Sequence, residues 1–190
     1  MELSLEYILS QVFVIVSYFL LVLSYQAKSR KNILVLSNIS LVANGIAYIF
    51  LQAYTGLAMC FVAILRNIIF LIDEKINGKT EKIEKKDIVI LAVLYLISVI
   101  STIFTYDGIL SLIPVVITMI YTYSVWQKKT SVYKLLGLPM GILWITYNIY
   151  IMSIFGIILE TILTISATYG YFKEKKISKN WHLHKINVII

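Results

Sequence analysis

Residues 56–104 read GLAMCFVAILRNIIFLI, then DEKINGKTEKIEKKD, then IVILAVLYLISVISTIF, so two apolar runs of 17 residues flank a charged stretch of 15. At roughly 1.5 Å per residue, a 17-residue helix is about long enough to cross a ~30 Å hydrocarbon core. The charged stretch is too polar to enter that core. The two runs are therefore predicted to be separate membrane spans whose charged ends lie on the same side.

The same alternation continues over the whole chain and predicts seven transmembrane helices. Besides 56–72 and 88–104, apolar runs occupy residues 7–25, 33–51, 109–126, 135–152 and 156–172. A composition of 59% hydrophobic and 14% charged residues, with a mean hydropathy of +0.85, leaves too few polar residues to cover a soluble surface. The fold class expected is an all-α integral membrane protein.

Positive charge predicts the orientation of these spans. Of the 17 Lys and Arg residues, 16 lie in four clusters, each separated from the next by two apolar runs; the clusters are Lys28, Arg30 and Lys31; Lys75, Lys79, Lys82, Lys85 and Lys86; Lys128, Lys129 and Lys134; and Lys173, Lys175, Lys176, Lys179 and Lys185. Because Lys and Arg near the ends of spans are retained in the cytoplasm, all four clusters are expected there. The N-terminus is then outside and the C-terminus inside.

Several other classes of protein and site are disfavoured by the sequence. The net charge of +7 gathers at span ends rather than on a basic helix, which favours orientation and anionic lipid over nucleic acid. No phosphate loop, zinc-protease helix or nucleophile elbow is found, so neither an enzyme nor a cofactor is expected. Cys60 is the single cysteine and reads as a small packing residue, while His182 and His184 are too few for a metal site.

The spans group as three, one and three, and the two groups of three match each other at a shift of about 100 residues. Gly56 and Gly156 open the third helix of each group, and residues 74–75 and 174–175 are both Glu-Lys. One further span between the groups gives both the same orientation, which predicts a parallel repeat. The expected units are 7–72, a loop and linker helix over 73–104, 109–172, and a cytoplasmic tail over 173–190. Gly137 and Gly141 have the GxxxG spacing of close helix packing.

Four short segments resemble those of a known family: AILR at 63–66, LIP at 112–114, WITYN at 144–148 and SIFGIILE at 153–160. With the three-one-three plan, they make the chain similar to the bacterial inner-membrane YgjV family, within the SWEET and PQ-loop superfamily. The resemblance covers about residues 7–176. It implies a small-solute carrier whose pathway lies between the two three-helix units.

Two ionisable residues fall inside predicted spans. A guanidinium facing lipid at the depth of Arg66 would cost roughly 2.5–3.5 kcal/mol, so Arg66 is expected to face protein or water. Glu160 lies nearer the outer end of its helix, and the ~9 Å difference in depth is within the combined reach of the two side chains. The pair is interpreted either as a solute or proton site or as a structural ion pair that locks two helices together.

Polar and aromatic residues on the second helix of each unit extend this site. Asn44 and Tyr48 share one helix face, as do Trp144 and Asn148, and the repeat places the two pairs opposite each other. A ring beside an amide suits a small polar molecule with a flat or sugar-like face, although amides also bond across helices for packing alone. The residues expected to bind the solute are Asn44, Tyr48, Arg66, Trp144, Tyr147, Asn148 and Glu160.

The function predicted from the sequence is alternating-access transport of a small polar metabolite, sugar-like or vitamin-like, across the bacterial inner membrane. The alternative is a non-transporting receptor or assembly partner with the same fold and a closed core. The expected partners are the solute and membrane lipids, without nucleic acid, and a homo-oligomer is compatible with the spans. A wide aqueous cavity at Arg66 would favour the carrier; a dry interface with Arg66 bonded to Glu160 would favour the alternative.

Overall fold

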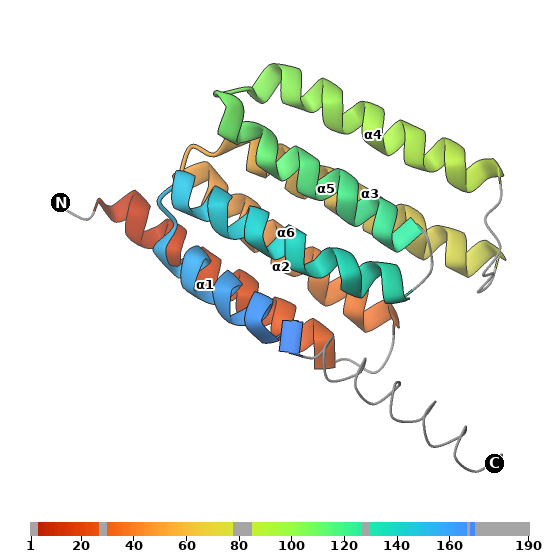
Figure 1. Cartoon of the computed structure of the whole chain (residues 1–190), viewed down its shortest axis with the longest axis horizontal. Helices are drawn as coiled ribbons and strands as arrows, with labels where there is room; N and C mark the ends of the chain where they lie inside the picture. Colours follow the sequence, from red (N-terminus) through yellow and green to blue (C-terminus); the bar gives the residue numbers. More distant parts are fainter. Residues whose placement is uncertain (1–3, 27–29, 78–84, 127–129, 167, 170–190) are drawn as a thin grey trace, which may run out of the picture.

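The computed structural model of the chain describes residues 4–26, 30–77, 85–126, 130–166 and 168–169. Within these ranges the chain forms helices and no strand, as predicted (Figure 1). The elements are α1 (Leu5–Gln26), α2 (Arg30–Phe50), α3 (Tyr54–Asn77), α4 (Lys85–Thr105), the short 3₁₀ helix η1 (Ile109–Leu112), α5 (Ile113–Trp126), α6 (Thr130–Tyr150) and a last helix, Ile154–Ser166. The predicted tail over 173–190, with His182 and His184, lies outside the described residues.

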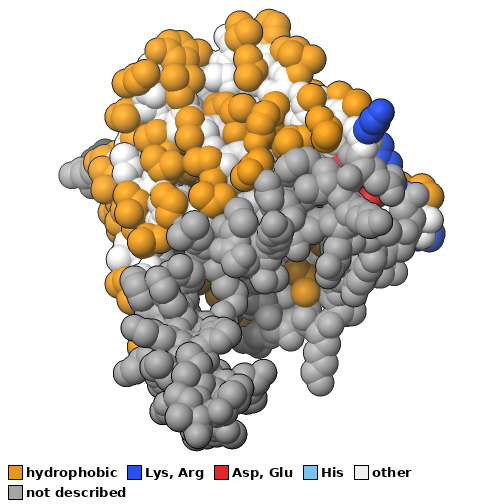
Figure 2. All heavy atoms as spheres, turned by 45° about the vertical axis from the view of Figure 1, so that its right-hand side comes forward, with side chains coloured by type: hydrophobic (Ala, Val, Ile, Leu, Met, Phe, Trp, Pro, Cys, Tyr) orange, Lys and Arg blue, Asp and Glu red, His pale blue; other side chains and the backbone are white. Residues whose placement is uncertain are grey.

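Four of the described helices are long and apolar enough to cross a membrane: Leu5–Ser24, Asn32–Phe50, Tyr54–Asp73 and Lys85–Thr105. Large apolar side chains are exposed along them, as at Phe19, Phe61 and Ile103. Apolar side chains cover most of the described surface seen in Figure 2, and the Lys and Arg side chains drawn there lie along one edge. Because so many apolar side chains in contact with water would be unfavourable, their exposure indicates that this surface contacts lipid.

The helices form two layers (Figure 1). In one layer α2 packs between α1 and α3, and in the other α6 packs between α5 and the last helix. Between the layers α3 contacts α5, the ring of Tyr48 on α2 contacts that of Tyr147 on α6, and Tyr18 on α1 bonds to Glu160 on the last helix. Helix α4 lies at one edge against both α3 and α5, and a Lys86–Asp73 ion pair of 3.1 Å joins its start to α3.

The internal repeat is present in the backbone of two turns. After α2, the N–H groups of residues 51, 52, 53 and 57 bond to the carbonyls of residues 47, 49, 48 and 53; after α6, the same four bonds recur exactly 100 residues later. Gln52 and Met152 both have left-handed φ, at 56° and 57°. Each helix therefore ends in a Schellman motif in which a non-glycine residue holds the left-handed position. We call this end of the bundle, which carries residues 51–56 and 151–156, the turn end.

The left-handed residues give a first prediction. Because a side chain at left-handed φ costs about 1–2 kcal/mol, Gln52→Gly is expected to raise the free energy of unfolding by up to about 1 kcal/mol after the greater freedom of unfolded glycine is subtracted. Thermal unfolding of the purified protein in detergent measures the change. Gln52→Ala removes the same side chain but keeps the Cβ, so it should give no gain; equal stabilisation by both variants would contradict the explanation.

The fifth predicted helix does not start as an α-helix, contrary to the prediction for residues 109–126. Residues 109–112 form η1, and α5 begins at Ile113. Gly108 enters η1 at a φ of 86°, and the Ser111 hydroxyl donates to the Gly108 carbonyl at 2.7 Å and accepts from the Asp107 N–H at 3.1 Å. Pro114 has no backbone N–H, and it lies in the first turn of α5, where backbone N–H groups have no acceptor within the helix. The proline is therefore compatible with a helix that begins at Ile113. The apolar pattern alone carried no sign of this change of helix type.

The GxxxG spacing on α6 predicted close packing at two glycines, and the structure supports it at one. A Cβ at Gly141 would collide with the side chain of Thr164 on the last helix, so the two backbones approach closely there. Among the described residues, a Cβ at Gly137 would meet nothing within 4 Å. Within this part of the chain the prediction does not hold for Gly137, because four residues of spacing place two glycines on one face but do not say where the neighbouring helix crosses it.

Candidate functional site between the two helix layers

The predicted site residues lie at two depths in the bundle. Tyr48, Trp144, Tyr147, Asn148 and Glu160 come from the halves of their helices nearer the turn end, whereas Arg66 lies ten residues beyond Gly56, or about 15 Å along the axis of α3. The two groups have different neighbours. We call the group around Tyr48, Tyr147 and Trp144 the aromatic cluster and the group around Arg66 the guanidinium cluster.

The aromatic cluster fills the centre of the bundle below the turn end. The ring of Tyr147 lies 6.0 Å from that of Tyr48 and 6.0 Å from that of Trp144, in edge-to-face geometry at 75° and 65°. Tyr147 and Tyr48 are only 1% and 2% exposed. The Tyr147 hydroxyl lies against the Gly56 backbone, where a Cβ would be 2.7 Å from it. Aromatic rings from the two layers therefore pack directly against each other here.

The two predicted amides have different surroundings. Asn148 is buried, and its side-chain oxygen would be 2.5 Å from a Cβ at Gly156, so it is packed onto the turn that follows α6. Asn44 is half-buried and its side chain interacts with Tyr48 and Cys60. The structure thus brings Asn44 into the aromatic cluster, while Asn148 supports the neighbouring turn.

The half-buried carboxylate of Glu160 accepts a hydrogen bond of 2.7 Å from the hydroxyl of Tyr18 on α1. Two further bonds join α1 to the same part of the chain: the Tyr7 hydroxyl donates to the Met152 carbonyl at 3.0 Å, and the Gln11 side-chain oxygen accepts from the Phe155 N–H at 3.0 Å. These hydrogen bonds hold the start of the last helix against α1 at the turn end.

The guanidinium cluster surrounds Arg66, which is 4% exposed. Its Nε and Nη2 donate to the Asn67 side-chain oxygen at 3.3 and 3.1 Å, its Nη1 reaches the Thr122 hydroxyl at 3.5 Å, and its Cζ lies 4.3 Å above the centre of the Tyr121 ring. Asn67 in turn donates to Asn38 on α2 at 2.9 Å. The guanidinium therefore lies inside the protein, stacked and hydrogen-bonded where α3 meets α5.

Arg66 and Glu160 are not paired in this structure. Among the described residues each makes its contacts with other side chains, Arg66 toward α5 and Glu160 toward α1. The two helices that carry them lie in different layers, and α3 faces α5 rather than the last helix. The two side chains are long enough to bridge the difference in depth between them. They do not meet because each points from its own helix toward a different neighbour.

Asn67 supports the guanidinium cluster, which gives a second prediction. Asn67→Leu removes the oxygen that accepts from two guanidinium nitrogens, and because hydrogen bonds to charged groups contribute about 1.5–3 kcal/mol, the free energy of unfolding should fall by about that amount. Asn38→Leu is the matched control, since Asn38 contacts Asn67 rather than the guanidinium, and it should cost less. The comparison is made by thermal unfolding in detergent. A larger effect at Asn38 would contradict this assignment.

Sequence reasoning missed the partners of the charged groups: Tyr18, Asn38, Asn67, Tyr121 and Thr122. One local signal was present, because Asn67 directly follows Arg66. The others come from α1, α2 and α5, and nothing in their own helices distinguishes them from ordinary tyrosine, asparagine and threonine. Among the described residues, no group of three or more His, Cys, Asp or Glu side chains could hold a metal ion.

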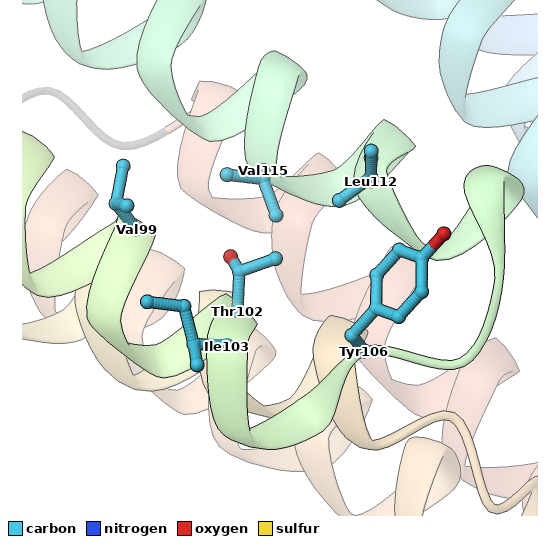
Figure 3. Close-up of a pocket in the computed structure, with 6 residues that line it drawn as sticks. All are labelled: Val99, Thr102, Ile103, Tyr106, Leu112 and Val115. Carbon is cyan, nitrogen blue, oxygen red and sulfur yellow. The ribbon is translucent and has the colours of Figure 1, made fainter.

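A groove of about 480 Å³ lies elsewhere, between α4 and the η1–α5 junction (Figure 3). Its lining is apolar apart from two hydroxyl-bearing residues: Val99, Thr102, Ile103, Tyr106, Leu112 and Val115. The Thr102 hydroxyl already donates to the Ser98 carbonyl at 2.7 Å. Since polar ligands need convergent polar groups, this groove does not suit the predicted solute, and none of the predicted site residues lines it.

Comparison with known protein families gives a match over most of the chain. The model of the family Imp-YgjV, described as "Bacterial inner membrane protein", matches residues 8–177. Comparisons with curated proteins and with solved structures gave no match. The matched region includes all of the helices from the first turn of α1 onward, and with them both clusters.

Proposed function

Since the chain belongs to the Imp-YgjV family of bacterial inner membrane proteins, we propose that it carries a small polar metabolite across that membrane by alternating access. It crosses the membrane seven times, as two parallel three-helix units joined by α4, with the N-terminus outside and the C-terminus in the cytoplasm. The turn end then faces outward. Its fold is of the SWEET type in this proposal.

The observation that carries the proposal is the symmetry of contacts between the layers. Under the shift of 100 residues, α1 corresponds to η1 and α5, and α3 to the last helix. The contact of α1 with the last helix therefore corresponds to the contact of α5 with α3, and the contact of α2 with α6 corresponds to itself. Two equivalent units that meet around a central α2–α6 contact can rock about it, which is the motion alternating access needs.

In this proposal the structure represents a form closed at the outer side. Tyr48, Tyr147 and Gly56 close the centre, and the bonds from Tyr7 and Gln11 clasp the two units together around it. The solute binds between the aromatic and guanidinium clusters, where ring faces, the Asn44 amide and Arg66 supply stacking and hydrogen bonds. It reaches the outside when the aromatic rings part.

The alternative function, a receptor or assembly partner that transports nothing, is favoured by a different observation. Tyr48 and Tyr147 fill the centre almost completely, and the buried Tyr147 hydroxyl lies against the Gly56 backbone. A protein whose centre never opened would have the same contacts. The carrier requires the contacts of Tyr48 and Tyr147 to break and re-form, whereas the receptor requires them to persist.

Cys60 provides the test, because it is the single cysteine, is 5% exposed and belongs to the same buried core as Tyr48 and Tyr147. A membrane-impermeant maleimide is applied to protein reconstituted in liposomes, with and without the metabolite that gives the largest thermal shift in a library screen. A carrier should show slow labelling of Cys60 that changes when this metabolite is added, together with its uptake. Cys60→Ser measures background labelling.

The outcome separates the two proposals. A thiol that stays unreactive under every condition, in liposomes that accumulate none of the metabolites that bind, would favour the closed receptor and overturn the carrier. Labelling that changes with the metabolite would exclude a permanently closed centre.

A further inference from the structure

The carboxylate of Glu160 occupies an unusual position for a charged group. It projects from an apolar helix between the two layers, and its hydrogen bond comes from a neutral hydroxyl, Tyr18, on the opposite unit. A tyrosine hydroxyl can donate to a carboxylate or accept from a carboxylic acid. The pair can therefore keep its hydrogen bond in both protonation states of Glu160.

The ionisable groups around this pair are mostly neutral. Helix α1 contributes Tyr18 itself, and Tyr48 on α2 lies near Tyr18. Tyr48 in turn packs with Cys60 on α3 and Tyr147 on α6. Arg66, the cation in the interior of the described bundle, is directed toward Tyr121 and Thr122 on α5. Among these described neighbours, no cation holds Glu160 in its charged form, so proton binding does not break an ion pair.

We propose that Glu160 and Tyr18 form a proton-binding site that couples proton movement to the rocking of the two units. This inference rests on the proposed carrier function and deepens it by naming the coupling ion. The bond spans the interface between the units, since Tyr18 lies in the first and Glu160 in the second. Protonation changes the strength of a bond that must be remade when the units move, because hydrogen bonds to an ionised group are about twice as strong as neutral ones.

The internal repeat shows that this site exists on one side only. At the shift of 100 residues, Cys60 corresponds to Glu160 and Thr118 to Tyr18, and both are buried. The equivalent positions between α3 and α5 thus hold a thiol and an aliphatic hydroxyl. Of these two equivalent pairs of positions, one holds a carboxyl group, so in this proposal the site moves one proton in each rocking cycle.

The proton step is balanced without any other reactant. In one orientation the carboxylate takes a proton from water on that side, and the neutral acid then turns with its unit. In the other orientation it returns the proton to water, and the carboxylate accepts again from the Tyr18 hydroxyl. Tyr18 keeps its own proton throughout.

Infrared difference spectroscopy of the full chain in liposomes tests proton binding directly. Spectra are recorded between about pH 5 and pH 9, on either side of neutral pH. We expect a carboxylic acid C=O band that titrates in the wild-type protein and is absent in Glu160→Gln. The band should persist in Glu6→Gln, which removes an exposed glutamate from α1, and should move in frequency in Tyr18→Phe, which removes only the hydroxyl. Identical titration spectra of the wild-type protein and Glu160→Gln would overturn the site.

Labelling of Cys60 by maleimide tests the coupling. The labelling rate is divided by that of the denatured chain at the same pH, which removes the intrinsic pH dependence of the thiol. The normalised rate should change with pH in the wild-type protein and stay constant in Glu160→Gln, whose amide imitates the neutral acid. A constant rate in both would overturn the coupling, whereas the carrier function is overturned when Cys60 stays unreactive under every condition and the liposomes accumulate none of the metabolites that bind.

Discussion

Gly56→Ala is expected to part the aromatic cluster and to increase the labelling of Cys60 several-fold. A Cβ at this position would be 2.7 Å from the Tyr147 hydroxyl and 3.0 Å from the Tyr48 ring. Both rings are almost fully buried, so neither can yield without displacing its neighbours. Forced overpacking of this kind typically costs about 1–3 kcal/mol, and here the strain is relieved when the two layers separate at the turn end.

The measurement combines thermal unfolding in detergent with maleimide labelling of Cys60 in liposomes. Gly137→Ala is the matched control, because among the described residues the same change on α6 meets nothing within 4 Å. It should leave Cys60 labelling unchanged and stability unchanged or slightly higher, since alanine favours a helix interior over glycine. If Gly56→Ala lowered stability while Cys60 stayed as protected as before, the cluster would be rigid packing. The proposal that it opens during transport would then lose its support.

The sequence predicted the helices, and the shift of 100 residues that relates two of the turns, because both follow from local properties. Each apolar run overlaps one helix, except 109–126, which overlaps η1 and α5, and α2 and α6 start at residues 30 and 130 and end at residues 50 and 150. The match of Gly56 with Gly156 also holds, since both lie beside turns with identical hydrogen bonds. Hydrophobicity and spacing along the chain determine such features, and neither requires knowledge of which helices are neighbours.

The contacts between helices could not be predicted in the same way. Helical spacing gives the depth of Arg66 and Glu160 but not the direction of each side chain around its axis relative to the other helices. Glu160 contacts Tyr18 and Arg66 contacts Tyr121 because α1 faces the last helix and α3 faces α5. Buried hydroxyls add to the difficulty: those of Ser98 and Thr102 bond to their own helix, so polarity in a span does not by itself mark a site.

Arg66→Met is expected to abolish binding of the metabolite while the protein remains folded in the membrane. Methionine keeps most of the side-chain volume, and replacing a buried charge by an apolar group is often neutral or stabilising because the cost of desolvating the charge disappears. Loss of a buried, hydrogen-bonded charge from a binding site typically costs about 2–5 kcal/mol, which corresponds to a loss of affinity of about 30-fold or more. Thermal shift with the metabolite measures binding, and uptake into liposomes measures transport.

Uptake decides between the two interpretations of Arg66. In either case, removal of the guanidinium leaves the Asn67 oxygen without these two donors, which costs about 1–3 kcal/mol and is offset in part because the charge is no longer desolvated. If the guanidinium serves only to join α3 to α5, uptake per folded molecule should be normal; if it binds the solute, uptake should be lost. Leu65→Met is the control, because it introduces the same residue at the neighbouring position, which is 46% exposed, and should alter neither property. A destabilised but fully active Arg66→Met protein would move Arg66 from the solute site to the helix interface.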